Sequence, residues 1–86
     1  MTIKSSIRTY ILENFLFTDD ESELDNNDSF LENGIIDSTG VLEIIFFLEE
    51  EFGIKIKDEE MIPDNLDSVT NIVNLLQSKI KVNNII

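Results

Sequence analysis

The chain has 86 residues, enough for one small domain, and its apolar content of 42% argues against disorder. Its formal net charge of −12 opposes binding to nucleic acid and to anionic membranes, and it favours partner proteins with basic surfaces. The sequence has no His and no Cys, which excludes an imidazole base, a thiol nucleophile, a disulfide framework and the usual zinc ligand sets.

Residues 3–17 are predicted to form the first helix, because apolar residues recur there at a spacing of three to four. This stripe consists of Ile3, Ile7, Tyr10 or Ile11, and Phe15. The acidic, Asn-rich residues 18–28 are expected to form a long loop, anchored by Leu24. A short turn over residues 29–32 is expected to end at Gly34.

A second helix is predicted to follow Asp37 and to end at Gly53. Its apolar face consists of Val41, Ile44, Ile45, Leu48 and Phe52. Residues 58–62 are expected to form one helical turn stopped by Pro63. The last helix begins near residues 67–68 and carries the stripe Val69, Ile72, Val73, Leu76 and Ile80.

Residues 82–86 are expected to fray, and the sequence contains no strand pattern of useful length. These elements predict an all-α fold, a small bundle of three main helices and one short helix with a long first loop. The longest strictly apolar run of the sequence, Ile44 to Leu48, is far too short for a membrane span. The N-terminus has no apolar segment of the kind found in signal peptides. We therefore expect one domain over residues 1–86, a cytoplasmic monomer without membrane contact.

Asp-Ser occurs three times, at residues 28–29, 37–38 and 67–68, each time just before a predicted helix. Asp and Ser are both favoured N-caps, so each pair is first of all a candidate cap. The pair Asp37-Ser38 differs in its context, because it follows a Gly-bearing turn and precedes an acidic amphipathic helix. A serine at that place can hold a phosphate near the partial positive charge of a helix N-terminus.

The segment from Gly34 to Ile54 resembles the core motif of acyl carrier proteins, and the resemblance continues through residues 58–63 and 67–72. It covers essentially the whole chain, including the long first loop. The resemblance implies that Ser38 carries 4'-phosphopantetheine through a phosphodiester bond, installed from coenzyme A by a phosphopantetheinyl transferase. The thiol of this arm would hold acyl or aminoacyl groups as thioesters. The arm would thus supply the thiol nucleophile that a chain without cysteine lacks.

The resemblance also implies a set of residues that meet partner enzymes: Asp37, Leu42, Glu43, Phe46, Glu49 and Glu50. Asp37 would help the transferase recognise the serine, and it can act as a helix cap at the same time. The glutamates would meet Arg and Lys of partners, although acids on a helix exterior are often only solvated. Leu42 and Phe46 lie off the predicted core face and would touch partners or the mouth of an acyl pocket, unless they pack against the first loop or the third helix. Phe47 is expected in the core.

Where many acyl carrier proteins have leucine after the serine, this chain has Thr39 followed by Gly40. Thr39 in place of leucine removes an apolar contact. Gly40 predicts a looser start of the helix, since Gly is a poor helix former. The variant is more similar to stand-alone carriers of specialised pathways, such as polyketide or aminoacyl condensations, than to the fatty-acid carrier. The expected partners are a loading ligase and condensing enzymes with basic docking patches, and no catalytic residue is expected in the chain itself.

Two other functions fit part of the sequence. The chain could be an unmodified acidic helical adaptor that binds a basic protein surface, in which case Ser38 would be dispensable. The oxygen-rich residues 25–29 also suggest a calcium loop, but an EF-hand needs Gly at its sixth position and an acid at its twelfth. Counted from Asp25 these positions hold Phe30 and Ile36, so no metal site is predicted.

Overall fold

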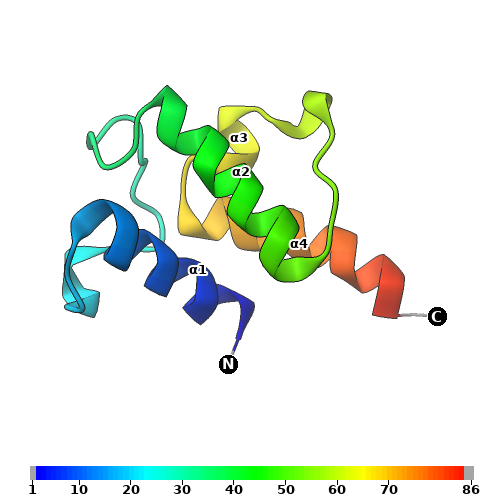
Figure 1. The fold of residues 1–86 in the computed structure, drawn as a ribbon, viewed down its shortest axis with the longest axis horizontal. Helices are drawn as coiled ribbons and strands as arrows, with labels where there is room; N and C mark the ends of the chain where they lie inside the picture. The colour runs from blue at the N-terminus through cyan, green and yellow to red at the C-terminus, as the bar shows by residue number, and fades with distance from the viewer. Residues whose placement is uncertain (1, 85–86) are drawn as a thin grey trace.

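The computed structural model describes the backbone of residues 2–84 and the side chains of residues 2–80. Within that range it contains helices and turns and no strand. The α-helices are α1 (Ile3–Ile11), α2 (Ser38–Phe52), α3 (Pro63–Leu66) and α4 (Val69–Asn84), and α2 crosses the molecule diagonally in Figure 1. This arrangement confirms the predicted all-α bundle of three main helices and one short helix.

The first helix ends in a wider turn than the sequence predicts. Helical structure covers the predicted span, but Leu12–Leu16 forms a π-helix, η1, and the backbone then reverses at Phe17 with a left-handed φ of 55°. The N–H of Phe17 donates to the C=O of Leu12 and so closes the last turn. Both Ile11 and its neighbour Leu12 are buried. An apolar stripe of ordinary helical period does not predict two consecutive buried residues at this point.

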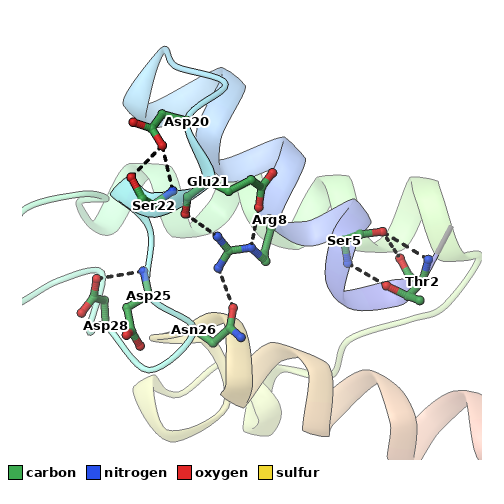
Figure 2. Close-up of polar contacts among 9 residues, drawn as sticks. All are labelled: Thr2, Ser5, Arg8, Asp20, Glu21, Ser22, Asp25, Asn26 and Asp28. Carbon is green, nitrogen blue, oxygen red and sulfur yellow. Dashed lines mark hydrogen bonds and ion pairs between the residues drawn. The ribbon is translucent and has the colours of Figure 1, made fainter.

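Arg8 ties α1 to the long first loop. Figure 2 shows its guanidinium between Glu21 and Asn26: Nε donates to Glu21 Oε1 at 2.9 Å, Nη2 to the Glu21 carbonyl at 2.8 Å and Nη1 to Asn26 Oδ1 at 2.6 Å. The carbonyl of Asn26 accepts the N–H of Thr70 at 2.9 Å, which links the same loop to α4. Leu24 is buried at 3% exposure, so its predicted role as the anchor of this loop is confirmed.

The core lies where the apolar faces of the helices and the first loop meet. Its buried apolar residues are Ile7, Ile11, Leu12, Leu24, Phe30, Ile36, Ile44, Ile45, Leu48, Ile56, Leu66, Val69, Ile72, Leu75 and Leu76. Each such side chain contributes roughly 1.5–3 kcal/mol by leaving water, before the opposing loss of chain entropy. The predicted stripes of α2 and α4 supply much of this set, and Phe30 brings the short turn after the loop into it.

Two predictions about the second half of the chain were wrong. The predicted single turn is present as the 3₁₀ turn η3 (Asp58–Glu60), but Pro63 does not stop it, because Pro63 is the first residue of α3. Proline suits that position because its fixed φ matches a helix and its missing N–H would have no partner in the first turn. Helix α4 also continues through residues 82–84, which were expected to fray, while residues 85–86 of that prediction lie outside the described part.

Candidate functional site

Ser38 is the first residue of α2, and its side chain is exposed. The preceding Asp37 has an extended backbone and is the N-cap, since its Oδ1 accepts the N–H of Gly40 at 2.8 Å. The helix ends as predicted at Gly53, whose φ of 64° and N–H bond to the Glu49 carbonyl form a left-handed cap. The fold therefore presents the Ser38 hydroxyl to solvent at a capped helix N-terminus, where the helix dipole favours an anion.

Gly40 brings the first turn of α2 close to two side chains. A Cβ atom at this position would lie 2.6 Å from Ile36 Cγ2 and 3.0 Å from Phe15 Cε1, so the glycine permits an approach that alanine would obstruct. Gly40 is itself buried. The expectation of a loose helix start rested on helix propensity alone, and the structure instead shows this turn packed against the core.

A hollow of about 170 Å³ lies beside Ser38 on the side of α3. It is lined by Leu31, Ser38, Val41, Met61, Ile62, Pro63, Leu66 and Asp67. Met61 and Ile62 are 36% and 44% exposed, which is high for large apolar side chains. Neither was among the predicted site residues. The available signal was an apolar Met-Ile-Pro run directly after three consecutive acids in a connecting segment.

Asp67 fixes one wall of this hollow. Its carboxylate accepts the hydroxyl of Ser29 through Oδ2 and the N–H of Leu31 at 3.0 Å through Oδ1, and its carbonyl accepts the N–H of Phe30 at 2.8 Å. The turn that carries Leu31 is thereby joined to the corner between α3 and α4. The sequence singled out the Asp67-Ser68 pair only as a cap.

All three Asp-Ser pairs do contain a capping side chain. Asp37 caps α2, Ser68 Oγ accepts the N–H of Asn71 at 3.1 Å at the start of α4, and Ser29 Oγ accepts the N–H of Glu32 at 3.1 Å in the short turn. Ser29 is part-buried and Ser68 is buried, whereas Ser38 is exposed and its pair caps through the aspartate. The structure thus separates Ser38 from the other two serines by accessibility.

The predicted partner residues of α2 fall into two groups. Leu42 and Phe46 are 63% and 64% exposed, so neither packs against the first loop or α3, and Glu43 and Glu50 are exposed beside them. Glu49 differs, because it is half-buried and its Oε2 accepts the N–H of Ile56 at 2.9 Å. Glu49 therefore holds the loop after α2, a structural role that the resemblance did not imply.

Tyr10 and Phe47 form the contact between α1 and α2. Their rings are stacked, with centroids 3.9 Å apart and an angle of 11° between planes, and the Tyr10 hydroxyl donates to the Glu43 carbonyl at 3.3 Å. Burial and the nearby Glu43 carboxylate raise the pKa of Tyr10. Phe47 was expected in the core; it is half-buried and packs against the core without being one of its buried residues.

The oxygen-rich segment of the first loop uses its side chains within the fold. Asp25 Oδ1 accepts the N–H of Asn27, Asp28 Oδ2 accepts that of Asp25, and Asn27 Oδ1 accepts the Thr70 hydroxyl at 2.8 Å. Among the residues that the structure describes, no group of three or more acidic side chains is placed to hold a metal ion. No helix within residues 2–84 is both long enough and apolar enough to span a membrane.

The surroundings of Ser38 fit a phosphopantetheine group. The hydroxyl is accessible, the helix N-terminus suits the negative charge of a phosphodiester, and the mainly apolar hollow offers a surface to the uncharged part of an arm. The cap of α2 is supplied by the Asp37 carboxylate and does not require the Ser38 hydroxyl.

Comparisons with known proteins agree with this geometry. The family model described as "Phosphopantetheine attachment site" matches residues 7–77. D-alanyl carrier proteins of Streptococcus pyogenes, from serotype M5 (strain Manfredo) and serotype M1, are 40% identical over 70 residues, which cover 79% of this chain and 87% of theirs. Among solved structures, a chain in the crystal structure of an FAD-dependent dehydrogenase matches with a TM-score of 0.69 and 27% identity, over 81% of this chain and 97% of that chain.

The family match spans most of the chain and includes both the capped start of α2 and the segments that form the hollow beside it. The chain belongs to the phosphopantetheine-dependent carrier proteins, and its cofactor is covalently attached 4'-phosphopantetheine.

Proposed function

We propose that Ser38 is the attachment residue and that the chain is a carrier domain for aminoacyl groups. The observation that carries the proposal is the position of Ser38, an exposed hydroxyl at the capped N-terminus of α2 beside an apolar hollow. The other two serines of the Asp-Ser pairs are more buried and take part in hydrogen bonds within the fold. When attached, the arm supplies a thiol, which holds cargo as a thioester.

The likeness to D-alanyl carrier proteins favours an amino acid over a fatty-acyl or polyketide chain as cargo. We therefore assign D-alanine or another small amino acid as the cargo, loaded by an adenylating ligase. A small cargo needs no space inside the bundle, where Phe30 is the largest of the fully buried side chains. The hollow at Ser38, about 170 Å³, is also small.

Mass spectrometry tests the attachment residue. The purified chain is incubated with coenzyme A and a broad-specificity phosphopantetheinyl transferase, and it should gain one phosphopantetheine group. Ser38→Ala should gain none, while the matched control Ser29→Ala should be modified like the native chain. Modification of Ser38→Ala, or none of the native chain, would refute the assignment of Ser38.

A loading assay tests the cargo separately. The modified chain is offered D-alanine, L-alanine and a medium-chain fatty acid, each with ATP and a matching adenylating ligase, and the product is weighed intact. The proposal expects loading of D-alanine in preference to the fatty acid. Equal or better loading of the fatty acid would overturn the aminoacyl assignment and leave the attachment at Ser38 untouched.

One further partner and one alternative function follow from specific observations. A chain in the crystal structure of an FAD-dependent dehydrogenase has a similar fold, which makes a flavin enzyme a candidate partner of the loaded carrier. The acidic surface also fits an unmodified adaptor that binds a basic protein. An adaptor would keep its partner and its activity in Ser38→Ala, whereas a carrier would lose activity while staying folded.

A further inference from the structure

The hollow beside Ser38 has one charged wall. The described residues that line it are apolar except for Ser38 and Asp67, and of these two only Asp67 carries a charge. The volume of the hollow, about 170 Å³, is similar to that of a cavity of about 150 Å³ that holds one benzene molecule. The hollow therefore has room for a group of a few heavy atoms, such as the thioester end of a small amino acid, and cannot enclose a medium-chain fatty-acyl group.

The Asp67 carboxylate is fixed in position and still has acceptor capacity. It accepts two hydrogen bonds, from the Ser29 hydroxyl and the Leu31 N–H, whereas a carboxylate offers about four acceptor sites. Within residues 2–80, whose side chains the structure describes, there are two ion pairs, and neither of them includes Asp67. A half-buried carboxylate that is held by the fold and has no cationic partner in that range is suited to bind an ammonium group.

We propose that Asp67 binds the α-ammonium group of an aminoacyl cargo when the loaded arm folds back into this hollow. Ser38 and Asp67 line the same hollow, so an arm attached at Ser38 begins at its edge. The ammonium group donates to the Asp67 carboxylate, and the small side chain of the cargo contacts the apolar lining at Val41 and Leu66. The inference rests on the proposed function, because it requires attachment at Ser38 and an aminoacyl cargo.

Asp67 is thereby a specificity residue for the class of cargo. An uncharged acyl group of the same size gains the apolar contacts of the hollow, but it removes water from the Asp67 carboxylate and supplies no hydrogen bond in return, which is unfavourable. An aminoacyl group replaces that water with a charge-assisted hydrogen bond. Because the carboxylate is already held by Ser29 and Leu31, little conformational entropy is lost when the ammonium group binds.

The first test compares two cargoes on the native chain. A phosphopantetheinyl transferase installs an arm from a coenzyme A analogue that ends in a D-alanyl amide, which does not hydrolyse as a thioester does. A second analogue ends in a propionyl amide, which is the same group without the amine. Backbone amide NMR spectra of the two modified chains should differ at Leu31, whose N–H donates to Asp67, and at Leu66, but not at Asn14 in η1. Identical spectra at Leu31 and Leu66 overturn the proposal.

The second test measures the pKa of the cargo ammonium group, followed by NMR of an isotope-labelled D-alanyl arm. A neighbouring carboxylate stabilises the charged form, so Asp67→Asn should lower this pKa by roughly 0.3–0.7 units. Asp64→Asn makes the same change of charge at an exposed position of α3 outside the hollow, and it should have a clearly smaller effect. Circular dichroism checks that both variants are folded. Equal pKa values in the two variants overturn the proposal.

Mass spectrometry of the same samples separates this inference from the proposed function. If neither analogue is installed, or if Ser38→Ala is modified as well, attachment at Ser38 is refuted and binding of the cargo by Asp67 falls with it. If both analogues are installed at Ser38, but the spectra at Leu31 are identical and the two variants have equal pKa values, only the role of Asp67 is refuted. Attachment at Ser38 then stands, and the cargo extends into solvent or onto a partner.

Discussion

Ser29 and Asp67 are 38 residues apart in the chain, and the hydroxyl of the first donates a hydrogen bond to the carboxylate of the second. The same carboxylate accepts the N–H of Leu31, and the backbone carbonyl of Asp67 accepts that of Phe30. One residue at the corner of α3 and α4 thus holds the whole turn that precedes α2. Because Leu31 and Asp67 both line the hollow beside Ser38, this contact also sets the shape of the candidate site.

Asp67→Ala should lower the free energy of unfolding by about 1–3 kcal/mol, because it leaves the part-buried Ser29 hydroxyl and the Leu31 N–H without their acceptor. Urea titration of the purified chain measures the loss. Ser29→Ala should cost less, and the double variant should cost less than the two single losses combined, since both remove the same bond. Additive losses would show that the two residues are not coupled.

Glu49→Ala should destabilise the fold by roughly 1 kcal/mol or more, because its carboxylate accepts the N–H of Ile56, a residue that is only 2% exposed. Glu50→Ala, the neighbouring exposed acid, should change stability by no more than about 0.5 kcal/mol. Thermal unfolding of the two variants gives the comparison. The same measurement matters for partner binding, because weaker binding by a Glu49 variant has to be corrected for its loss of folding stability. Equal midpoints for the two variants would contradict the structural role.

Glu60 makes the stability of the chain depend on pH. Its Oε1 lies 2.6 Å from Lys79 Nζ, and hydrogen bonds from Lys79 and from the Lys57 N–H lower the pKa of Glu60 below its ordinary 4.5. A lowered folded-state pKa stabilises the fold at pH values above the unfolded pKa, and this contribution disappears as the pH falls through the folded-state pKa. Melting temperatures of the native chain and Glu60→Gln should therefore differ at neutral pH and converge in acid. A constant difference down to the lowest pH would exclude this linkage. Lys79→Met should remove part of the pH dependence, because the hydrogen bond from the Lys57 N–H remains.

Gly40→Ala should destabilise the chain although alanine is the better helix former by about 1 kcal/mol. The new methyl group would meet the Ile36 side chain at 2.6 Å, and overpacking of this kind costs about 1–3 kcal/mol. Ile36 is β-branched and has little rotamer freedom with which to give way. Thr39→Ala, at an exposed position of the same turn, should be neutral or slightly stabilising in the same urea titration. A Gly40→Ala chain that is more stable than the native one would show that the contact relaxes without cost.

The sequence predicts the features of this fold that arise from neighbouring residues. The apolar stripes of α2 and α4, the left-handed cap at Gly53 and the anchor at Leu24 are all local patterns, and each is confirmed. The expected exposure of Leu42 and Phe46 follows from helical period in the same way, and so does the place of Ser38 at the start of α2.

What the sequence does not predict depends on residues that are distant in the chain or on backbone choices of similar energy. The bond between Ser29 and Asp67 requires the tertiary fold, since each residue alone is an ordinary cap. Pro63 can either end one helix or begin another, and in the structure it begins α3, whose Leu66 is buried at 2% exposure. Asn14, in the π-helical turn Leu12–Leu16, lines the same surface hollow as Phe46 of α2, and only the tertiary fold brings these two segments together.

The close packing at Gly40 limits the movement of the helix turn that carries Ser38. The side chains of Phe15 and Ile36 occupy the space that a side chain at position 40 would need. This close contact restrains the first turn of α2, which carries Ser38, against tilting or unwinding. An arm attached at Ser38, as we propose, would therefore move about a fixed point of attachment. The reach of its thiol would then depend on the rotatable bonds of the arm and on the position of the bound partner, and little on flexibility of the helix.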